Sequence, residues 1–344
     1  MIDSIASELK LQKAYLNHEP ISTVYFGGGT PSILEIKELE KLTRSIDLNF
    51  NLIATPEITL EANPDDLSKK KLSGLKSLGI NRLSIGIQSF QDKTLKFLNR
   101  AHNAYEAIKC IENARHIEFD NLSIDLIFSI PGQSITDLDF DISQALLLNP
   151  EHISVYSLTI EDKTVFGNWQ SKGKFIQVSD EESAKQFELV ITRLEENSYE
   201  QYEISNFCRD SNYAQHNTAY WKNVNYLGVG PGAHSFNGKS RQSNIANNHK
   251  YMNSIEKGIV PFVLDKLSDR SMANEYLMTS LRTKWGCELK KLHTRFGYDL
   301  QKQQNDKLQE LIKTEMIYTM DEIIFLTKKG KFVADQIISE LFWI

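Results

Sequence analysis

Five short runs rich in β-branched and apolar residues, each followed by a helix-like stretch, constrain the fold of this 344-residue chain most strongly. The runs are nearly continuous in apolar character or only partly alternating, as parallel strands buried on both faces tend to be. Strand followed by helix, repeated along the chain, predicts an α/β fold with a parallel sheet, open or curled into a partial (β/α) barrel. The five runs are 22–26, 57–60, 82–87, 121–127 and 152–158.

The chain changes character after about Glu161, where strand and helix stop alternating. The stretch 163–173 is polar and predicts a loop, and 180–197 predicts an amphipathic helix. From about Ser268 helical patterns return, followed by a hairpin over 316–326 and a last helix over 328–341. This order is typical of a small, mostly helical, winged-helix-like C-terminal domain, for which we favour a structural role over nucleic-acid binding.

Composition excludes several classes of protein. The formal net charge of −6 argues against a generic nucleic-acid binder, which carries a basic excess. No run approaches the roughly 18 apolar residues that cross a membrane, and residues 1–16 read as a mixed-charge amphipathic helix and not as a signal peptide. Cys110, Cys208 and Cys287 are odd in number and far apart, so free thiols are expected and no disulfide framework follows. These features predict a cytoplasmic protein.

Glycine and polar residues collect where the predicted strands end, and ligands of parallel α/β sheets bind at those carboxyl ends. Three glycines, 27–29, follow the first run, where backbone amides could approach a ligand closely. Their spacing matches neither a Walker loop nor GxGxxG, so no nucleotide triphosphate site follows. Glu61 and Asn63 follow the second run, and Gln88 the third. Asp125 lies inside the apolar fourth run, where a carboxylate is costly unless it is paired or binds something.

Each of these residues also has a plain structural interpretation. The glycines could form a tight turn, Asn63 could belong to a turn with Pro64, and Glu61 could bond neighbouring loops. Converging on one rim, the polar residues instead favour a small ligand with an amine, a carboxylate and hydroxyl groups. A guanidinium suits a carboxylate and an acidic side chain suits a diol. We name Glu61, Gln88, Arg100 and Asp125 the rim cluster.

Several motifs resemble, in order and spacing, those of oxygen-independent coproporphyrinogen III oxidases and their HemW-type heme-chaperone relatives, both in the radical S-adenosylmethionine superfamily. The likeness runs from Ser22 to about Phe236, and the tail resembles that family's C-terminal domain. The motifs are YFGGGTP, EANP, RLSIGIQSF with LNRAH, SIDLIFSIPGQ and YLGVGPGAHS.

The resemblance implies a partial (β/α) barrel that binds S-adenosylmethionine. Glycines after the first strand, with the threonine that follows them, would lie near the methionine amine. Arg100 would pair with the carboxylate, and Asp125 or Gln88 with the ribose hydroxyls. The residues assigned to this cofactor are Gly28, Gly29, Thr30, Glu61, Gln88, Arg100 and Asp125.

A further segment, HNTAYW at 216–221, resembles the HNxxYW signature that separates HemW-type chaperones from true coproporphyrinogen oxidases. Histidine is a natural axial ligand of heme iron, and flanking aromatic rings can pack a porphyrin face. The resemblance therefore implies heme binding, without making His216 the iron ligand itself. His234, in GPGAHS, is a second candidate or a structural member of its glycine loop. The residues assigned to heme are His216, Asn217, Tyr220 and Trp221.

The CxxxCxxC motif, which holds a 4Fe-4S cluster in full-length relatives ahead of the GGGTP strand, has no counterpart in this sequence. Either the sequence is N-terminally truncated or a natural relative has lost the cluster, and the intact rim cluster favours truncation. In both cases we expect that the chain alone does not form the adenosyl radical. We also expect the strand before the glycines to be an exposed sheet edge, which invites aggregation.

These features predict a HemW-type heme chaperone that delivers heme to acceptor proteins from an S-adenosylmethionine-binding scaffold. The alternatives are an oxygen-independent coproporphyrinogen III oxidase and a cluster-free scaffold or regulatory protein, so catalysis stays open. An oxidase would need a second S-adenosylmethionine site and an N-terminal extension, neither of which is visible. A homodimer is also left open. The predicted domains are a barrel over 1–240, a connecting segment over 241–267 and a C-terminal domain over 268–344.

Overall fold

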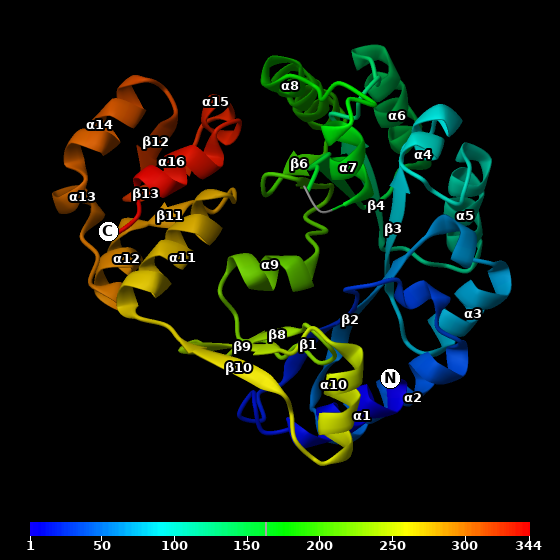
Figure 1. Cartoon of the computed structure of the whole chain (residues 1–344). Coiled ribbons are helices and arrows are strands. Elements are labelled where there is room, and N and C mark those ends of the chain that lie inside the picture. Colours follow the sequence, from blue (N-terminus) through cyan, green and yellow to red (C-terminus); the bar gives the residue numbers. More distant parts are fainter. Residues whose placement is uncertain (162–163) are drawn as a thin grey trace. The chain divides into compact units, whose positions relative to one another are not determined.

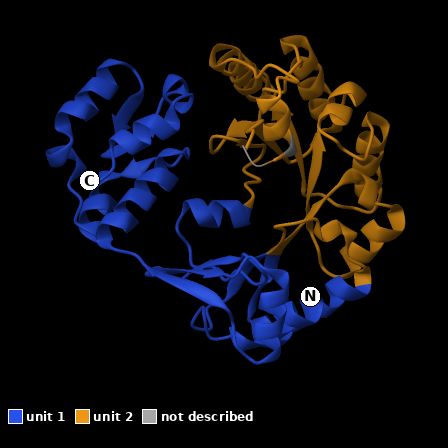
Figure 2. Cartoon of the chain, in the orientation of Figure 1, with its two compact units in different colours: residues 1–24, 37–56, 215–344 blue, residues 25–36, 57–214 orange. Residues whose placement is uncertain are grey.

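The structure is a computed structural model that describes residues 1–161 and 164–344 (Figure 1). It contains two compact units, each assembled from separated segments of the chain (Figure 2). Unit 1 comprises residues 1–24, 37–56 and 215–344, and unit 2 comprises residues 25–36 and 57–214. Two strands, β1 (Ile21–Phe26) and β2 (Leu52–Ala62), run from one unit into the other.

Within the described residues, seven strands form one sheet in the order β1-β2-β3-β4-β5-β7-β6. The strands from β2 to β5 are parallel, and the short β7 and β6 add antiparallel pairs beside β5. All five predicted strands are present, and β1 stands at one end of the order, which confirms its predicted edge position. The remaining strands are β3 (Arg82–Gln88), β4 (Leu122–Phe128), β5 (His152–Ser157), β6 (Glu200–Gln201) and β7 (Asn206–Cys208).

Helices separate the strands of unit 2, as the alternating pattern predicts. Capping boxes start two of them, formed by Asn103 with Glu106 and by Ser134 with Asp137. β3 is buried from Arg82 to Ile87, which explains why its sequence does not alternate. The helical elements are η1 (Pro31–Ile33), η2 (Pro64–Asp66), α3 (Lys69–Ser77), α4 (Asp92–Phe97), α5 (Ala104–His116), α6 (Ile135–Leu148), α7 (Val165–Ser171) and α8 (Asp180–Glu196).

The loop predicted over 163–173 is wrong, because this stretch contains α7. Thr164 starts the helix by accepting a hydrogen bond from the Gly167 amide at 3.1 Å. The ring of Phe166 packs on Phe97 with centroids 5.4 Å apart. This contact between residues far apart in the sequence stabilises a helix that the local sequence pattern does not predict. Lys163, at the start of the predicted loop, lies outside the described residues.

Unit 1 begins with α1 (Ile2–Leu11), which packs against α10 (Asn248–Glu256). A three-stranded antiparallel sheet of β8 (His234–Phe236), β9 (Ser240–Asn244) and β10 (Phe262–Lys266) belongs to the same unit. Glu8 of α1 is fully buried and accepts hydrogen bonds from the Gly230 amide and from Asn244 Nδ2, both at 2.7 Å. The remaining elements before the C-terminal domain are α2 (Ile36–Asn49) and α9 (Gln215–Trp221).

The C-terminal residues of unit 1 follow the predicted winged-helix-like order. The predicted hairpin is confirmed, and its turn residues Asp321 and Glu322 both have positive φ, as a tight hairpin turn requires. The single last helix predicted over 328–341 is wrong: it is two short helices that part near Val333. The elements are α11 (Asp269–Leu281), β11 (Cys287–Glu288), α12 (Leu289–Phe296), α13 (Leu300–Gln303), α14 (Asn305–Lys313), β12 (Ile317–Met320), β13 (Ile323–Leu326), α15 (Lys328–Lys331) and α16 (Ala334–Glu340).

The predicted domain boundaries at 240 and 268 stay a prediction. The predicted connecting segment contains most of β9 and all of α10 and β10. Among the helices that the structure describes, none combines the length and the apolar character needed to cross a lipid bilayer.

Candidate functional site

The carboxyl ends of β1 and β2 place Glu61 against a tyrosine and a glycine of unit 2. The Tyr25 hydroxyl donates to Glu61 Oε1 at 2.7 Å. A Cβ atom on Gly27 would lie 2.5 Å from Tyr25 Cε1 and 2.8 Å from Glu61 Oε1. Gly27 is therefore the glycine of the triplet that this packing requires. Burial, followed by the charge of Glu61, raises the pKa of Tyr25 above its ordinary value, so the phenol stays a donor.

A second group of contacts joins Gln88 and Arg100 at the end of β3. Arg100 Nη2 donates to Asn63 Oδ1 at 2.6 Å and to the Gly86 carbonyl at 3.1 Å. A Cβ atom on Gly86 would lie 2.7 Å from Gln88 Nε2 and 3.2 Å from Arg100 Nη2. Gly86 thus leaves room for both side chains beside the strand. Gln88 itself has a φ of 69°, a left-handed conformation, so the extended backbone of β3 ends at this residue.

Asp125 connects these contacts electrostatically. Burial is the main cause that raises its pKa to about 6, the Glu61 carboxylate adds to the rise, and a Ser154 hydrogen bond and Arg82 oppose it. Burial lowers the pKa of Arg100, and the charges of Asp65 and Asp125 oppose that shift. The four residues of the rim cluster therefore meet around the ends of β2, β3 and β4.

The other residues predicted for the same cofactor are less tied to this group. Gly28 and Gly29 are exposed and an added Cβ would meet no atom within 4 Å at either position, so packing does not demand glycine there. Gly28 does need its glycine for a φ of 78°. Thr30 precedes η1 without a capping hydrogen bond from its side chain. These three residues lie on the loop that begins at Gly27.

Tyr25, Gly27, Asn63 and Gly86 are the neighbours that the assignment from sequence left out. Asn63 follows the second predicted strand but is not among the residues that the sequence assigns to the cofactor. Gly86 carried a usable signal, because a glycine inside an otherwise apolar strand often marks a close approach of another group. Tyr25 carried none, since a tyrosine inside a strand is ordinary.

The segment HNTAYW forms α9, in unit 1. His216 Nδ1 lies 2.8 Å from Thr23 Oγ1, and its Nε2 lies 3.0 Å from the Tyr220 hydroxyl. The rings of His216 and Tyr220 meet edge to face with centroids 5.0 Å apart. Burial raises the pKa of Tyr220 to about 12, so its hydroxyl keeps its proton at neutral pH. Asn217 and Trp221 lie half-buried on the same helix.

Aromatic side chains continue from α9 toward the small sheet of unit 1. Tyr220 meets Tyr226 edge to face at 4.6 Å, and Tyr226 lies 6.3 Å from the ring of Phe236. We name His216, Tyr220, Tyr226 and Phe236 the aromatic row. His234 lies two residues before Phe236 on β8, is exposed, and has its Nδ1 2.9 Å from Ser243 Oγ. His234 is thus a strand residue and not part of the glycine loop before it.

The three cysteines do not fit an iron–sulfur cluster. They are buried on α5, β7 and β11, and within the described residues none of them is paired in a disulfide. Burial raises the pKa of Cys110 and of Cys287 to about 12, as is typical of thiols enclosed in a protein core. Within the described residues, no group of three or more His, Cys, Asp or Glu side chains could hold a metal ion.

Comparison with known proteins gives consistent results. The model of the radical SAM superfamily matches residues 2–143, and that of the HemN C-terminal domain matches residues 267–333. The sequence is 34% identical to the heme chaperone HemW of Bacillus subtilis over 342 residues, which cover 98% of this chain and 89% of that protein. It is also 34% identical to the heme chaperone HemW of Lactococcus lactis, over 91% of this chain and 82% of that protein.

The structure resembles that of the coproporphyrinogen III oxidase HemN of Escherichia coli, a radical SAM enzyme, with a TM-score of 0.84. The match covers 99% of this chain and 82% of that chain at 21% identity, which is evidence about the fold. It confirms the predicted α/β fold with a partial barrel and a small helical C-terminal domain. Taken with the identity to HemW proteins along almost the whole sequence, these findings place the chain in the HemW family of the radical SAM superfamily.

Proposed function

We propose that this chain is a heme chaperone, which binds heme as cargo and delivers it to acceptor proteins. The observation that carries the proposal is the 34% identity to HemW of Bacillus subtilis over 98% of the chain. The aromatic row of unit 1 supplies the chemistry that such a cargo needs. A cytoplasmic location and the domain division at 240 and 268 belong to the same proposal.

The aromatic row suits a flat, apolar macrocycle with an iron at its centre. Tyr220 is 41% exposed, so an aromatic side chain of the row is available to a ligand. Aromatic rings bury a large area and favour offset or edge contacts with another π-system. His216 contributes by fixing Tyr220 through Nε2 and Thr23 through Nδ1. Asn217 and Trp221, on the same helix, complete the residues that we assign to heme.

Heme titration tests this proposal directly. The wild-type chain is expected to shift and sharpen the Soret band of added hemin, and His216→Ala to bind about 10-fold more weakly, because Tyr220 loses a neutral hydrogen bond and its ring partner. His249→Ala removes an exposed histidine of α10 and serves as the matched control, with unchanged affinity. A wild-type spectrum identical to that of free hemin would contradict the proposal.

We further infer that the rim cluster of unit 2 binds S-adenosylmethionine, together with Gly28, Gly29 and Thr30. Both hydrogen bonds described for the Arg100 guanidinium come from Nη2, so within the described residues Nη1 and Nε keep donors for a carboxylate. Asp125 would accept from the ribose hydroxyls, and the loop at Gly28 offers backbone amides. The bound cofactor supplies a sulfonium whose methyl and adenosyl groups can be transferred.

Affinity for S-adenosylmethionine should therefore depend on pH through Asp125, whose raised pKa of about 6 places its titration in an accessible range. The ionised carboxylate accepts two hydroxyl hydrogen bonds and the protonated form accepts fewer. As the pH falls below about 6, the dissociation constant should rise, at most about tenfold per pH unit. Calorimetry between pH 5 and 7 measures this, a range that lies below the pKa of the ligand's α-amino group.

Asp125→Asn is the control for this dependence. The variant is expected to bind about 10-fold more weakly at pH 7, because an amide replaces a charge-assisted acceptor. It should also flatten the change between pH 5 and 7. The charged and titratable groups that interact with Asp125 are unchanged in the variant; they are Tyr25, Glu61, Arg82, Arg100 and Tyr156. Equal affinity of wild type and variant at both pH values would remove Asp125 from the binding site.

A further inference from the structure

We infer that His234 supplies the imidazole nitrogen that binds the heme iron, and that His216 acts as a positioning residue for the aromatic row. The inference rests on the proposed heme-chaperone function and specifies which residue of this chain contacts the metal. The sequence leaves the iron ligand open between His216 and His234, and the inference decides for His234.

The two histidines differ in which ring nitrogens are available. His216 has a partner at each nitrogen, Thr23 Oγ1 at 2.8 Å and the Tyr220 hydroxyl at 3.0 Å. Binding a metal through either one requires that a hydrogen bond be broken first. His234 is exposed and engages only Nδ1, with Ser243 Oγ at 2.9 Å. Among the residues that the structure describes, none forms a hydrogen bond with its Nε2.

The Ser243 contact is the kind of support that a metal-binding histidine has. Metal-binding imidazoles usually donate their second ring N–H to a neighbouring acceptor, which fixes the tautomer and the ring orientation. When Nδ1–H donates to Ser243 Oγ, the lone pair of Nε2 is left for a metal. His234 and Ser243 are directly paired across β8 and β9, so two strands fix this arrangement.

The face of the small sheet around His234 includes both charged and apolar side chains. Side chains two residues apart on a strand share a face, so His234 lies on the same face as Phe236, whose buried ring is covered by the Arg241 guanidinium. On the other side, Ser243 pairs with Val263 of β10, whose side chain is 73% exposed. The imidazole therefore has the Arg241 guanidinium on one side and, across β9, an exposed valine on the other. An exposed apolar side chain on an edge strand favours aggregation unless a ligand or a partner covers it.

Hemin titrations of the full chain, followed by absorption and electron paramagnetic resonance spectra, test the inference. Wild type should give a histidine-ligated spectrum, and His234→Ala should lose it with at least about 10-fold weaker binding. Added imidazole should restore the ligated spectrum of His234→Gly. Ser243→Ala should keep the ligated spectrum but weaken binding about 10-fold, since it removes only the support of Nδ1. His216→Ala should keep the ligated spectrum, and His249→Ala should match wild type in every respect.

Each outcome separates the inference from the function on which it rests. A His234→Ala variant that keeps the wild-type ligated spectrum overturns the inference and leaves heme binding intact. A wild type that leaves the hemin spectrum unchanged defeats the proposed function itself. His234 and Ser243 lie at or near the surface, so circular dichroism of the variants should match wild type, and a spectral change can be assigned to the metal.

Discussion

Glu8→Ala is expected to lower the free energy of unfolding by about 4 kcal/mol, because it leaves several buried donors without an acceptor. The Glu8 carboxylate is fully buried and accepts from the Gly230 amide, from Asn244 Nδ2 and from Gln12 Nε2 at 2.7, 2.7 and 2.8 Å. The Tyr251 hydroxyl is a fourth donor. Urea denaturation followed by circular dichroism measures the loss.

Two further variants sharpen this experiment. Lys10→Ala changes an exposed residue of the same helix and should shift stability by no more than about 0.5 kcal/mol. Glu8→Gln keeps the shape but brings an NH₂ group among donors, so an intermediate loss of about 2 kcal/mol is expected. A change below 1 kcal/mol for Glu8→Ala would mean that the carboxylate does not organise unit 1.

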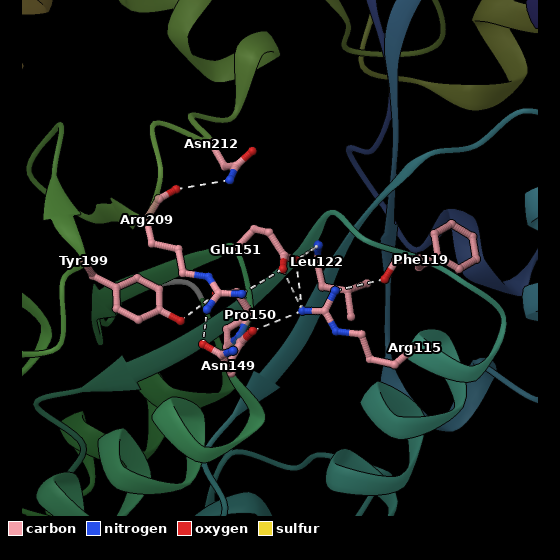
Figure 3. Close-up of polar contacts among 9 residues, drawn as sticks. All are labelled: Arg115, Phe119, Leu122, Asn149, Pro150, Glu151, Tyr199, Arg209 and Asn212. Atoms are coloured by element: carbon pink, nitrogen blue, oxygen red, sulfur yellow. Dashed lines mark hydrogen bonds and ion pairs between the residues drawn. The ribbon is translucent and has the colours of Figure 1, made fainter.

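Glu151→Ala is expected to cost about 3 kcal/mol of unfolding free energy in unit 2, because it leaves two guanidinium groups without their shared carboxylate. Figure 3 shows Glu151 between Arg115 and Arg209. Arg115 Nη2 lies 3.0 Å from both carboxylate oxygens, and Arg209 Nη2 lies 3.2 Å from Oε1. The Leu122 amide also donates to Glu151, at 2.9 Å, and so ties the group to the start of β4.

A surface ion pair provides the comparison for this variant. Glu181 and Lys185 form an exposed pair on α8, and Glu181→Ala should cost no more than about 0.5 kcal/mol. Glu151 precedes β5 at the amino ends of the strands, whereas the rim cluster lies at their carboxyl ends. Affinity for S-adenosylmethionine should therefore change little in Glu151→Ala while the protein is folded. Equal losses of unfolding free energy in Glu151→Ala and Glu181→Ala would mean that Glu151 stabilises the protein no more than a surface ion pair does.

The strands of unit 2 could be predicted from sequence because a strand that is buried on both faces has a nearly continuous apolar sequence, as in 82–87. The rim cluster could be proposed because a predicted strand also predicts which residues lie at its carboxyl end. In the structure, Tyr25 contacts Glu61, and Gly86 leaves room for Gln88 and Arg100. The assignment of these residues to S-adenosylmethionine stays a prediction. The tyrosine and the glycines around them depend on pairings between strands, which local patterns do not encode.

Other features depended on contacts between distant residues. α7 forms although its sequence is polar, because Phe166 packs on Phe97. The predicted last helix is divided at Val333, whose φ of −123° and ψ of 30° lie outside the helical range. The helical periodicity of the sequence continues across this break and does not reveal it. Nothing in the local sequence marks Glu8 as buried, since a glutamate in a surface helix looks the same.

The interleaved segments of unit 1 bear on how the protein is made. Glu8 meets Gly230, Asn244 and Tyr251 across sequence separations of 222, 236 and 243 residues. At the usual pace of synthesis, about 5–20 residues per second, α1 leaves the ribosome roughly 10 to 50 seconds before these partners exist. While unit 2 is completed, the newly made chain therefore carries α1 with the Glu8 carboxylate in water and without its protein partners. The buried arrangement around Glu8 can form only after residue 251 has been made, so the assembly of unit 1 should be a late step of folding during translation.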